Sequence, residues 1–337
     1  MKVCYFGIYD PEYARNRVLI KGLRLSGIEV ILCYDRSPSL MKYIRLCIRH
    51  WRIRQKYDVM IVGFPGQIAM PLARLISSRP IILDAFISFY EMNVFDRSLY
   101  SSRSFYAAWY FLIDWLSCRM ADIVLLDTNA HIDYFAKTFN VPRKKMKRVL
   151  GGAEIETEYA GFRENFLVHW HGSCIPLHGV EYILRAPSFI RDESVRWEFV
   201  GCGDAPPQPR VAFSGVVSFH ELMERVKKST ICLGIFGATA KAQRVIPNKI
   251  YEYLSAGKPV ITADTPAIRE IFTEKELLLI PSCDSAAIAY GVSLLKNDTE
   301  LRRSLAANGR KKFLERATPA VLGLALREII KEVLLYE

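Results

Sequence analysis

The sequence lacks the long apolar runs and the paired cysteines that are typical of membrane-spanning chains and of zinc-binding or redox-active ones. Its longest uncharged run, Val59–Ala73, has about 15 residues, whereas a spanning helix needs about 20 apolar residues. The eight cysteines stand singly, without a C-x-x-C pair, so we expect buried thiols in a reducing compartment. The segment Met1–Gly7 is too short for a signal peptide and is predicted to be a first strand.

Motifs for metal and dinucleotide binding are also missing. There is no D-x-D motif, and His169 and His171 have no further candidate ligands nearby in the sequence. A dinucleotide-binding fold needs G-x-G-x-x-G after its first strand. Gly7 stands alone there, and Gly201-Cys202-Gly203 lacks a third glycine at the right spacing. We therefore expect no metal and no cofactor, and the sequence argues against an oxidoreductase.

What the sequence does contain is a regular alternation of strand and helix patterns over 337 residues. That length favours two domains, and the alternation predicts parallel sheets covered on both faces. The predicted fold class is α/β, with two Rossmann-like, doubly wound domains facing across a cleft. We expect the first domain over residues 1–150, the second over 151–315 with a linker near 141–158, and a C-terminal helix over 316–337 that packs back on the first domain. The expected strands are 3–6, 29–34, 59–62, 80–84, 123–126, 166–171, 197–200, 211–213, 231–235, 260–262 and 277–280.

The net charge of +11 lies entirely in the first half of the chain. Residues 42–56 contain six basic side chains and no acidic one. At helical spacing they form a basic stripe of Lys42, Arg45, Arg49, Arg52 and Lys56, beside an apolar stripe of Ile44, Cys47, Ile48 and Trp51.

This pattern is typical of an amphipathic helix on an anionic membrane surface. It predicts a cytoplasmic protein that is peripheral on the inner face of the cytoplasmic membrane. The alternative is that the apolar stripe packs on the sheet and the basic stripe is simply solvated. The aromatic residues over 105–115 fit either a lipid interface or a core.

The segment 234–271 has the clearest local boundaries. A strand ends near Gly237, and Pro247-Asn248 then opens a helix that ends at Gly257, since proline favours a helix start and glycine a helix end. The free N–H groups of a helix start attract phosphate. The sequence therefore predicts an anion site near Pro247 and Asn248.

Charged residues surround this predicted anion site. Lys241, Arg244 and Lys249 would donate charged hydrogen bonds to a phosphate. Glu252, one turn into the helix, would accept two ribose hydroxyls. The alternative is a surface helix on which Lys249 and Glu252 form an i,i+3 ion pair.

The run from Pro247 to Val260, P-N-K-I-Y-E-Y-L-S-A-G-K-P-V, resembles the donor site of glycosyltransferase family 4, a retaining family with the GT-B fold. The resemblance implies that Glu252 holds the ribose of a nucleotide-sugar donor and that Glu270 faces the donor sugar. His171–Glu181 resembles the glycine-rich loop that meets the donor diphosphate, which implies donor-binding roles for Gly172, Ser173 and His178. The segments around Gly201 and Gly203 and over 211–215 resemble the strands that flank the nucleotide base.

The sequence departs from that family at two places. Many members carry two glutamates eight residues apart, but the position eight before Glu252 is Arg244. The Arg and Lys that often clamp the diphosphate in the first loop look replaced by Ser173 and His178. We infer that phosphate neutralisation has moved to Lys241, Arg244 and Lys249, with Arg244 and Lys249 as catalytic cations.

The first half supplies the candidate acceptor residues. Gly7 and the segment after it, with Asp10, Glu12 and Arg15, follow a strand end and resemble the opening loop of some family members. Asp84 sits at the end of another predicted strand, where it would orient or deprotonate an acceptor hydroxyl; the alternative is a helix cap. Asp127 and His131 are weaker candidates, and a helix-start role for Asp127 or Thr128 is favoured instead.

The sequence thus predicts a metal-independent hexosyltransferase-type enzyme. It would move a sugar from a UDP- or GDP-sugar to an acceptor hydroxyl with retention, and the acceptor would be lipid-linked or a glycan in polysaccharide or glycolipid assembly. A nucleotide-sugar epimerase with the same fold is the alternative. Nucleic-acid binding through the basic cluster at residues 143–148 is a remote one, because no nucleic-acid module accompanies the charge.

Overall fold

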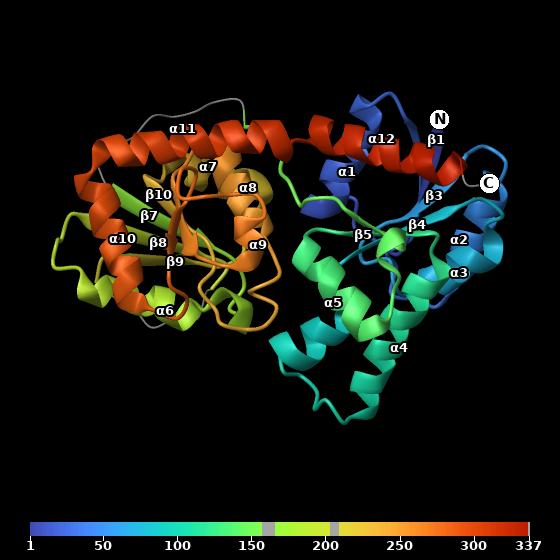
Figure 1. The fold of residues 1–337 in the computed structure, drawn as a ribbon, viewed down its shortest axis with the longest axis horizontal. Coiled ribbons are helices and arrows are strands. Elements are labelled where there is room, and N and C mark those ends of the chain that lie inside the picture. Colours follow the sequence, from blue (N-terminus) through green and yellow to red (C-terminus); the bar gives the residue numbers. More distant parts are fainter. Residues whose placement is uncertain (157–165, 203–208, 336–337) are drawn as a thin grey trace. The chain divides into compact units, whose positions relative to one another are not determined.

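The chain divides into two compact units, which are described separately. One unit comprises Met1–Gly152 with Arg316–Glu337, and the other comprises Ala153–Glu315. The computed structural model describes residues 1–156, 166–202 and 209–335 (Figure 1). Each unit contains one six-stranded sheet with helices on its faces.

The sheet of the first unit is parallel throughout, in the order β2-β1-β3-β4-β5-β6. Its central strands are short apolar runs that are buried on both faces, as a sheet between two helical layers requires. The strands are β1 (Lys2–Gly7), β2 (Glu29–Tyr34), β3 (Val59–Val62), β4 (Ile81–Phe86), β5 (Ile123–Leu126) and β6 (Met146–Arg148). The basic strand β6 falls within the segment that the sequence assigned to a linker, and it pairs with β5.

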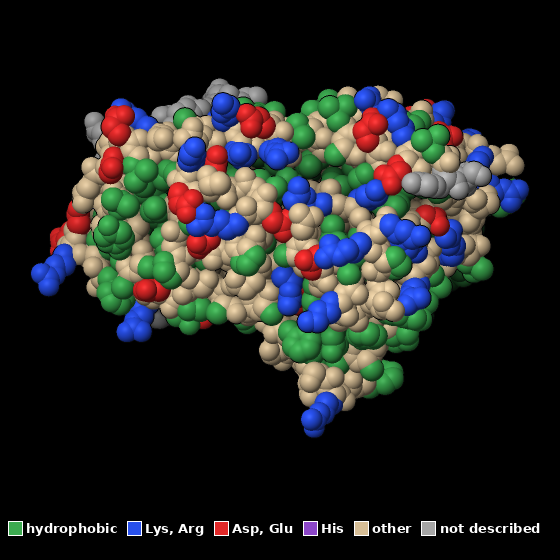
Figure 2. Space-filling model, in the orientation of Figure 1, with side chains coloured by type: hydrophobic (Ala, Val, Ile, Leu, Met, Phe, Trp, Pro, Cys, Tyr) green, Lys and Arg blue, Asp and Glu red, His purple; other side chains and the backbone are tan. Residues whose placement is uncertain are grey.

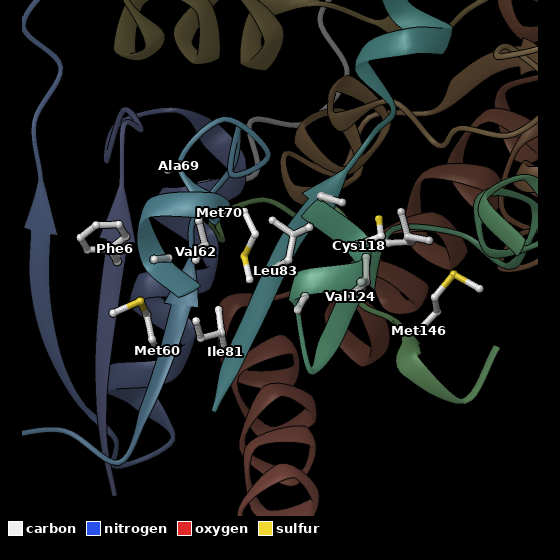
Figure 3. Packing of buried hydrophobic residues seen from close by; sticks show 14 of the residues in the cluster. Phe6, Met60, Val62, Ala69, Met70, Ile81, Leu83, Cys118, Val124 and Met146 are labelled. Atoms are coloured by element: carbon white, nitrogen blue, oxygen red, sulfur yellow. The ribbon is translucent and has the colours of Figure 1, made fainter. Parts of the chain in front are cut away.

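Four helices of the first unit share one hydrophobic core with this sheet. Alternate residues of a strand face opposite sides, and Figure 3 shows Phe6, Met60 and Val62 in the resulting cluster with Met70 and Cys118 from the helices. The helices are α2 (Met41–Trp51), α3 (Met70–Ile76), α4 (Phe105–Met120) and α5 (Asn129–Phe139), with a short π-helix over Glu91–Asp96 and a 3₁₀ turn over Arg143–Lys145.

The opposite face of this sheet is covered by α1 (Ala14–Leu25) and α12 (Pro319–Leu335), which lie side by side (Figure 1). Two glycines permit the close approach of these helices. A Cβ atom on Gly323 would lie 1.9 Å from the carbonyl oxygen of Gly22, and one on Gly22 would lie 2.3 Å from that of Pro319. The C-terminal helix therefore packs backbone to backbone on α1.

The second unit has a parallel sheet in the order β12-β11-β10-β7-β8-β9. The order of strands along the chain reverses between β7 and β10, and ligands of such sheets bind beyond the strand ends at this point. The strands are β7 (Phe166–His171), β8 (Val195–Val200), β9 (Val211–Ser214), β10 (Ile231–Leu233), β11 (Val260–Ala263) and β12 (Leu278–Ile280). The helices are α6 (Val180–Arg185), α7 (Phe219–Lys228), α8 (Asn248–Ser255), α9 (Pro266–Arg269), α10 (Ser285–Asn297) and α11 (Thr299–Arg316), with 3₁₀ turns over Pro176–His178 and Ala186–Phe189. The predicted fold class, two doubly wound parallel sheets, is confirmed.

Two expectations need correction. Helix α2 ends at Trp51 rather than at residue 56, so Arg52 and Lys56 of the basic stripe lie in the turn that follows. The expectation that all eight cysteines are free thiols is also wrong, because Cys174 and Cys202 form a disulfide with their Cα atoms 5.9 Å apart. Both cysteines follow the ends of paired strands, β7 and β8, so the sheet brings them within bonding distance.

No described helix combines the length and the apolarity that a membrane span requires.

Candidate functional site

The site at the strand reversal of the second unit begins with a glycine turn after β7. Gly172 has a φ of +148°, and a Cβ atom there would lie 2.7 Å from Nζ of Lys249 and 3.0 Å from Cε1 of His178. Any side chain at position 172 would clash with both residues. The positive φ of Gly172 is also a backbone conformation that favours glycine. The glycine therefore allows the turn to lie directly against a lysine of α8.

Lys249 is a buried lysine that makes no hydrogen bond to any described residue. Its Nζ atom lies 4.2 Å from the centre of the Trp170 ring and makes no hydrogen bond within the described chain. Burial lowers the pKa of Lys249 to about 7, while the nearby Glu252 acts in the opposite direction. A buried ammonium group is costly unless it is paired, so an anion beside Gly172 would supply the missing partner.

The start of α8 adds to the positive character of the site. Pro247 precedes the helix and offers no side-chain cap, and the helix begins at Asn248. The Oδ1 atom of Asn248 is buried and has no hydrogen-bond partner in the described chain. The N–H groups of the first helical turn and the helix dipole thus act in the same direction as Lys249 on a bound anion.

His178 supports the turn and does not contribute a charge. Its Nδ1–H donates to the carbonyl oxygen of Ser173 at 2.6 Å, and its ring packs edge-on against Trp170 at 5.6 Å. Burial, together with the nearby Lys249, lowers the pKa of His178 to about 2. His178 therefore stabilises the turn from Gly172 to Ser173 through its hydrogen bond. Since its ring is neutral, the positive charge of the site comes from Lys249.

A cavity of about 200 Å³ opens beside the glycine turn. It has a polar wall at the end of β7 and an apolar wall after β9. At one side of the cavity the backbone of Gly201 packs directly against the backbone of Gly172. The φ of Gly201 is +94°, and a Cβ atom there would lie 2.7 Å from the carbonyl oxygen of Gly172. The cavity is lined by His171, Gly172, Ser173, Val200, Gly201, Val216, Val217 and Leu222. Gly203, the other glycine predicted here, lies outside the described residues.

Glu252 reaches the same turn from α8. Its Oε2 atom lies 2.9 Å from Nε2 of His171, and the backbone N–H of His171 donates to the Tyr253 hydroxyl at 3.2 Å. Burial is the main cause of a lowered pKa for His171, so His171 is a neutral donor to the carboxylate. The structure therefore brings together Gly172, Ser173, His178, Lys249 and Glu252, which the sequence had selected from two distant segments.

The other predicted cations lie in the loop between β10 and α8. The backbone N–H of Arg244 donates to the carbonyl oxygen of Lys241 at 2.9 Å, so both lie on one turn. Burial lowers the pKa of Arg244. The same loop bonds to the start of α9, where Ala267 donates to the carbonyl oxygen of Gln243 at 3.2 Å, and Glu270 follows that helix.

The candidate acceptor residues of the first unit divide into a buried and an exposed pair. Asp84 and Arg15 are fully buried and form an ion pair of 2.9 Å, and Arg15 also donates to the carbonyl oxygens of Val149 and Leu150. Through Arg15, the carboxylate of Asp84 at the end of β4 is therefore linked to the segment that follows β6. Asp10 instead lies at the surface, 2.8 Å from Arg36, and Glu12 is exposed beside it. Gly7 precedes them at the end of β1.

A buried acidic and histidine cluster in the first unit was only partly predicted. Thr128, one of the two residues predicted for the helix start, caps α5, while Oδ1 of Asp127 lies 2.5 Å from Nδ1 of His131. Oε2 of Glu91, from the π-helix, lies 3.5 Å from Nε2 of the same histidine. The spacing of Asp127 and His131 was visible in the sequence, but the approach of Glu91 depends on the tertiary fold. No group of residues in the described chain has the arrangement of a metal site.

Residues 163–321 match a protein-family model described as glycosyl transferase-like, and no curated protein matches the sequence. Among solved structures, the chain is similar to HepE from Anabaena in complex with UDP, with 15% identity, a TM-score of 0.72, and coverage of 98% of this chain and 100% of that one. It is also similar to sucrose-phosphate synthase from Thermosynechococcus elongatus, with 12% identity, a TM-score of 0.75, and full coverage of both chains. A glycosyltransferase from Rickettsia africae gives 12% identity, a TM-score of 0.67, and coverage of 99% and 98%. These likenesses show the GT-B fold, and the family match supports a glycosyltransferase.

Proposed function

We propose that the chain is a retaining glycosyltransferase of family 4 that transfers a hexose from a nucleoside-diphosphate sugar to an acceptor hydroxyl. The donor binds in the second unit, at the ends of β7 and β10. The observation that carries this proposal is the buried amino group of Lys249 beneath the glycine turn, which has no hydrogen-bond partner among the described residues. A diphosphate on Gly172 would satisfy that cation and the first N–H groups of α8 together.

The parts of a nucleotide fit the surroundings of this anion site. The ribose lies against Glu252, whose carboxylate accepts its hydroxyls, and the base enters the cavity lined by Val216, Val217 and Leu222. HepE has been solved with UDP-glucose, and an alpha-glucosyltransferase with UDP and DNA is another similar structure. These structures favour a UDP-sugar donor over a GDP-sugar for this chain.

Charge stabilisation is the catalytic contribution of the second unit. Departure of the nucleoside diphosphate places negative charge on its terminal phosphate, and a preorganised cation and a helix start lower that barrier. Lys249 is already desolvated for this task, and Arg244 and Lys241 lie on the loop that leads into α8. Positioned cations of this kind replace a metal ion, so we propose a metal-independent enzyme.

The proposed acceptor is lipid-linked or a growing glycan, reached from a membrane surface. The side chains of Ile44, Ile48 and Trp51 on α2 are exposed, with Trp51 65% exposed, so the apolar stripe does not pack on the sheet. Helix α4 also exposes Phe105 and Trp109, and Figure 2 shows hydrophobic side chains gathered over the part of the first unit where α4 lies. Exposed apolar side chains flanked by arginine and lysine favour a peripheral position on an anionic cytoplasmic membrane.

The first test is ligand-dependent thermal stabilisation with UDP-, GDP- and ADP-sugars. A ligand at 100 times its Kd stabilises the folded state by about 2.7 kcal/mol. We expect stabilisation by a UDP-sugar that is lost in Glu252→Ala. Product analysis with and without an acceptor then separates a transferase from an epimerase, which would change the sugar without an acceptor. No stabilisation by any nucleotide sugar would contradict the proposed donor site.

A further inference from the structure

Four polar side chains contact one another in series behind the candidate ribose site and form a polar network. Oε2 of Glu198 lies 2.9 Å from Nδ1 of His169, Nε2 of His169 lies 3.2 Å from Nδ1 of His171, and Nε2 of His171 lies 2.9 Å from Oε2 of Glu252. At the other end of this polar network, Arg225 of α7 forms an ion pair with Glu198 at 3.1 Å. The polar network thus connects α7 to the carboxylate proposed to hold the donor ribose.

The parallel sheet dictates this alignment. His169 and His171 are two residues apart on β7 and face the same side of the sheet. Glu198 is the register partner of His169 on β8, and Glu252 descends from α8. Tyr253 packs its ring against His171 at 4.9 Å and against His169 at 6.0 Å. His169 and His171 are both buried, so their proton positions are set by these neighbours and not by water.

The number of N–H protons on the two histidine rings limits how many contacts of the polar network can be hydrogen bonds. Ionised carboxylates only accept hydrogen bonds, and a neutral imidazole carries one N–H. Burial is the main cause of the lowered pKa values of both histidines, to about 4 for His169. At neutral pH the polar network therefore has two N–H protons for three contacts, and one contact must lack a hydrogen bond.

The empty contact falls between the two rings. Bonds to a carboxylate are charge-assisted and stronger than a bond between two neutral imidazoles, so each ring donates outward. His169 then carries its proton on Nδ1, toward Glu198, and His171 carries its proton on Nε2, toward Glu252. The distances agree with this assignment, because the contact between the rings is the longest of the three.

We propose that His171 is a positioning residue for the donor: its Nε2–H fixes Oε2 of Glu252 so that Oε1 is presented to the ribose hydroxyls. The inference rests on the proposed function, since it assigns the ribose to Glu252. Among the described residues, His171 is the side chain that lies within hydrogen-bond distance of the Glu252 carboxylate and can hold its orientation. His171 acts on the ribose through Glu252, and its own ring lines the cavity proposed for the base.

The test compares two probes, UDP and inorganic pyrophosphate, by titration calorimetry on the full chain. His171→Phe keeps an aromatic ring beside Tyr253 and removes the N–H donor. We expect its Kd for UDP to rise on the order of 10-fold, while its Kd for pyrophosphate stays within about 2-fold. His171→Gln restores an N–H donor and should bind UDP within about 3-fold of the native chain. His220→Phe, which replaces an exposed histidine of α7, is the control and should match the native chain.

Unchanged UDP binding in His171→Phe, or an equal loss of UDP and pyrophosphate, would overturn the inference. If the native chain binds neither probe, the proposed function itself fails. If the native chain binds UDP and His171→Phe binds it equally well, only this inference fails. A measurement without any variant is the long-range ¹H–¹⁵N spectrum of the histidine rings at pH 7.5. We expect the proton of His171 on Nε2; a proton on Nδ1 would contradict the proposal.

Discussion

The Nζ atom of Lys249 lies 4.2 Å from the centre of the Trp170 ring and has no hydrogen-bond partner in the described chain. The aromatic face stabilises the ammonium group only in part, and burial keeps it from water. The folded unit therefore holds a desolvated cation at the place where a diphosphate would bind. This arrangement favours binding of an anion at the expense of the stability of the ligand-free protein.

Replacing Lys249 should separate stability from binding. Lys249→Met removes the buried charge and keeps the length of the side chain. We expect the ligand-free protein to gain about 1 kcal/mol in free energy of unfolding and to lose about 100-fold in affinity for UDP, as measured by denaturation and calorimetry. Lys258→Met is the matched control, because Lys258 is buried but already donates to the carbonyl oxygen of Lys227. It should lose stability and keep UDP affinity; a Lys249→Met variant that binds UDP normally would contradict the assignment.

Donor binding should take up a proton above pH 7. The pKa of Lys249 is about 7 in the free protein, and a bound diphosphate raises it toward the ordinary value of a lysine. Donor affinity should therefore fall as pH rises from 7 to 9, by up to about 10-fold per pH unit. Calorimetry at pH 8 in buffers of different ionisation enthalpy measures the proton directly, and Lys249→Met should show none.

The same depressed pKa has the opposite effect on the ligand-free protein. Between pH 7 and 10.5 the unfolded chain binds more protons at this lysine than the folded chain, so the free energy of unfolding should rise with pH across this window. Equal pH slopes for the native chain and Lys249→Met would show that Lys249 is not the group responsible.

Thiol counting should detect the bond between Cys174 and Cys202. The unfolded, unreduced protein should expose six reactive thiols and the reduced protein eight. The cysteines are separated by 28 residues, so Cys202→Ser should lower the free energy of unfolding by about 3 kcal/mol under oxidising conditions. Cys283→Ser, which removes a free thiol, is the control. Eight reactive thiols before reduction would show that the bond does not form in solution.

The contact between α1 and α12 should tolerate no side chain at Gly323. In Gly323→Ala the new Cβ atom would clash with the carbonyl oxygen of Gly22, which forces the helices apart. We expect a loss of about 1–3 kcal/mol in free energy of unfolding, measured by denaturant titration. Gly215→Ala is the control, since its Cβ atom would meet nothing within 4 Å. A neutral Gly323→Ala would mean that the helices do not approach this closely.

Membrane binding should depend on the exposed face of α2. A double variant, Ile48→Glu with Trp51→Glu, places two negative charges on exposed positions and should abolish sedimentation with vesicles of anionic phospholipid at low salt. Tyr290→Glu, at an exposed position on α10, should sediment like the native chain. If the native chain stays in the supernatant, the proposed membrane surface is wrong.

The order of elements followed from the sequence because each has its own local pattern. Four- to six-residue apolar runs predicted most strands, and Pro247 and Gly257 marked the ends of α8. The basic strand β6 (Met146–Arg148) was missed because its Lys and Arg side chains give no apolar pattern. Its pairing with β5 supplies the stabilisation that its composition does not.

The sequence by itself determined the two parallel sheets, the glycine turn at Gly172 and the charged start of α8. Only the tertiary structure decided the electrostatics of these residues. It paired Asp84 with Arg15, joined Cys174 to Cys202 and buried Lys249 with no hydrogen-bond partner in the part of the chain that the structure describes. The physical reason is that residue types and local spacing fix hydrogen bonds along one segment, whereas burial and pairing depend on which strand ends the sheet places side by side.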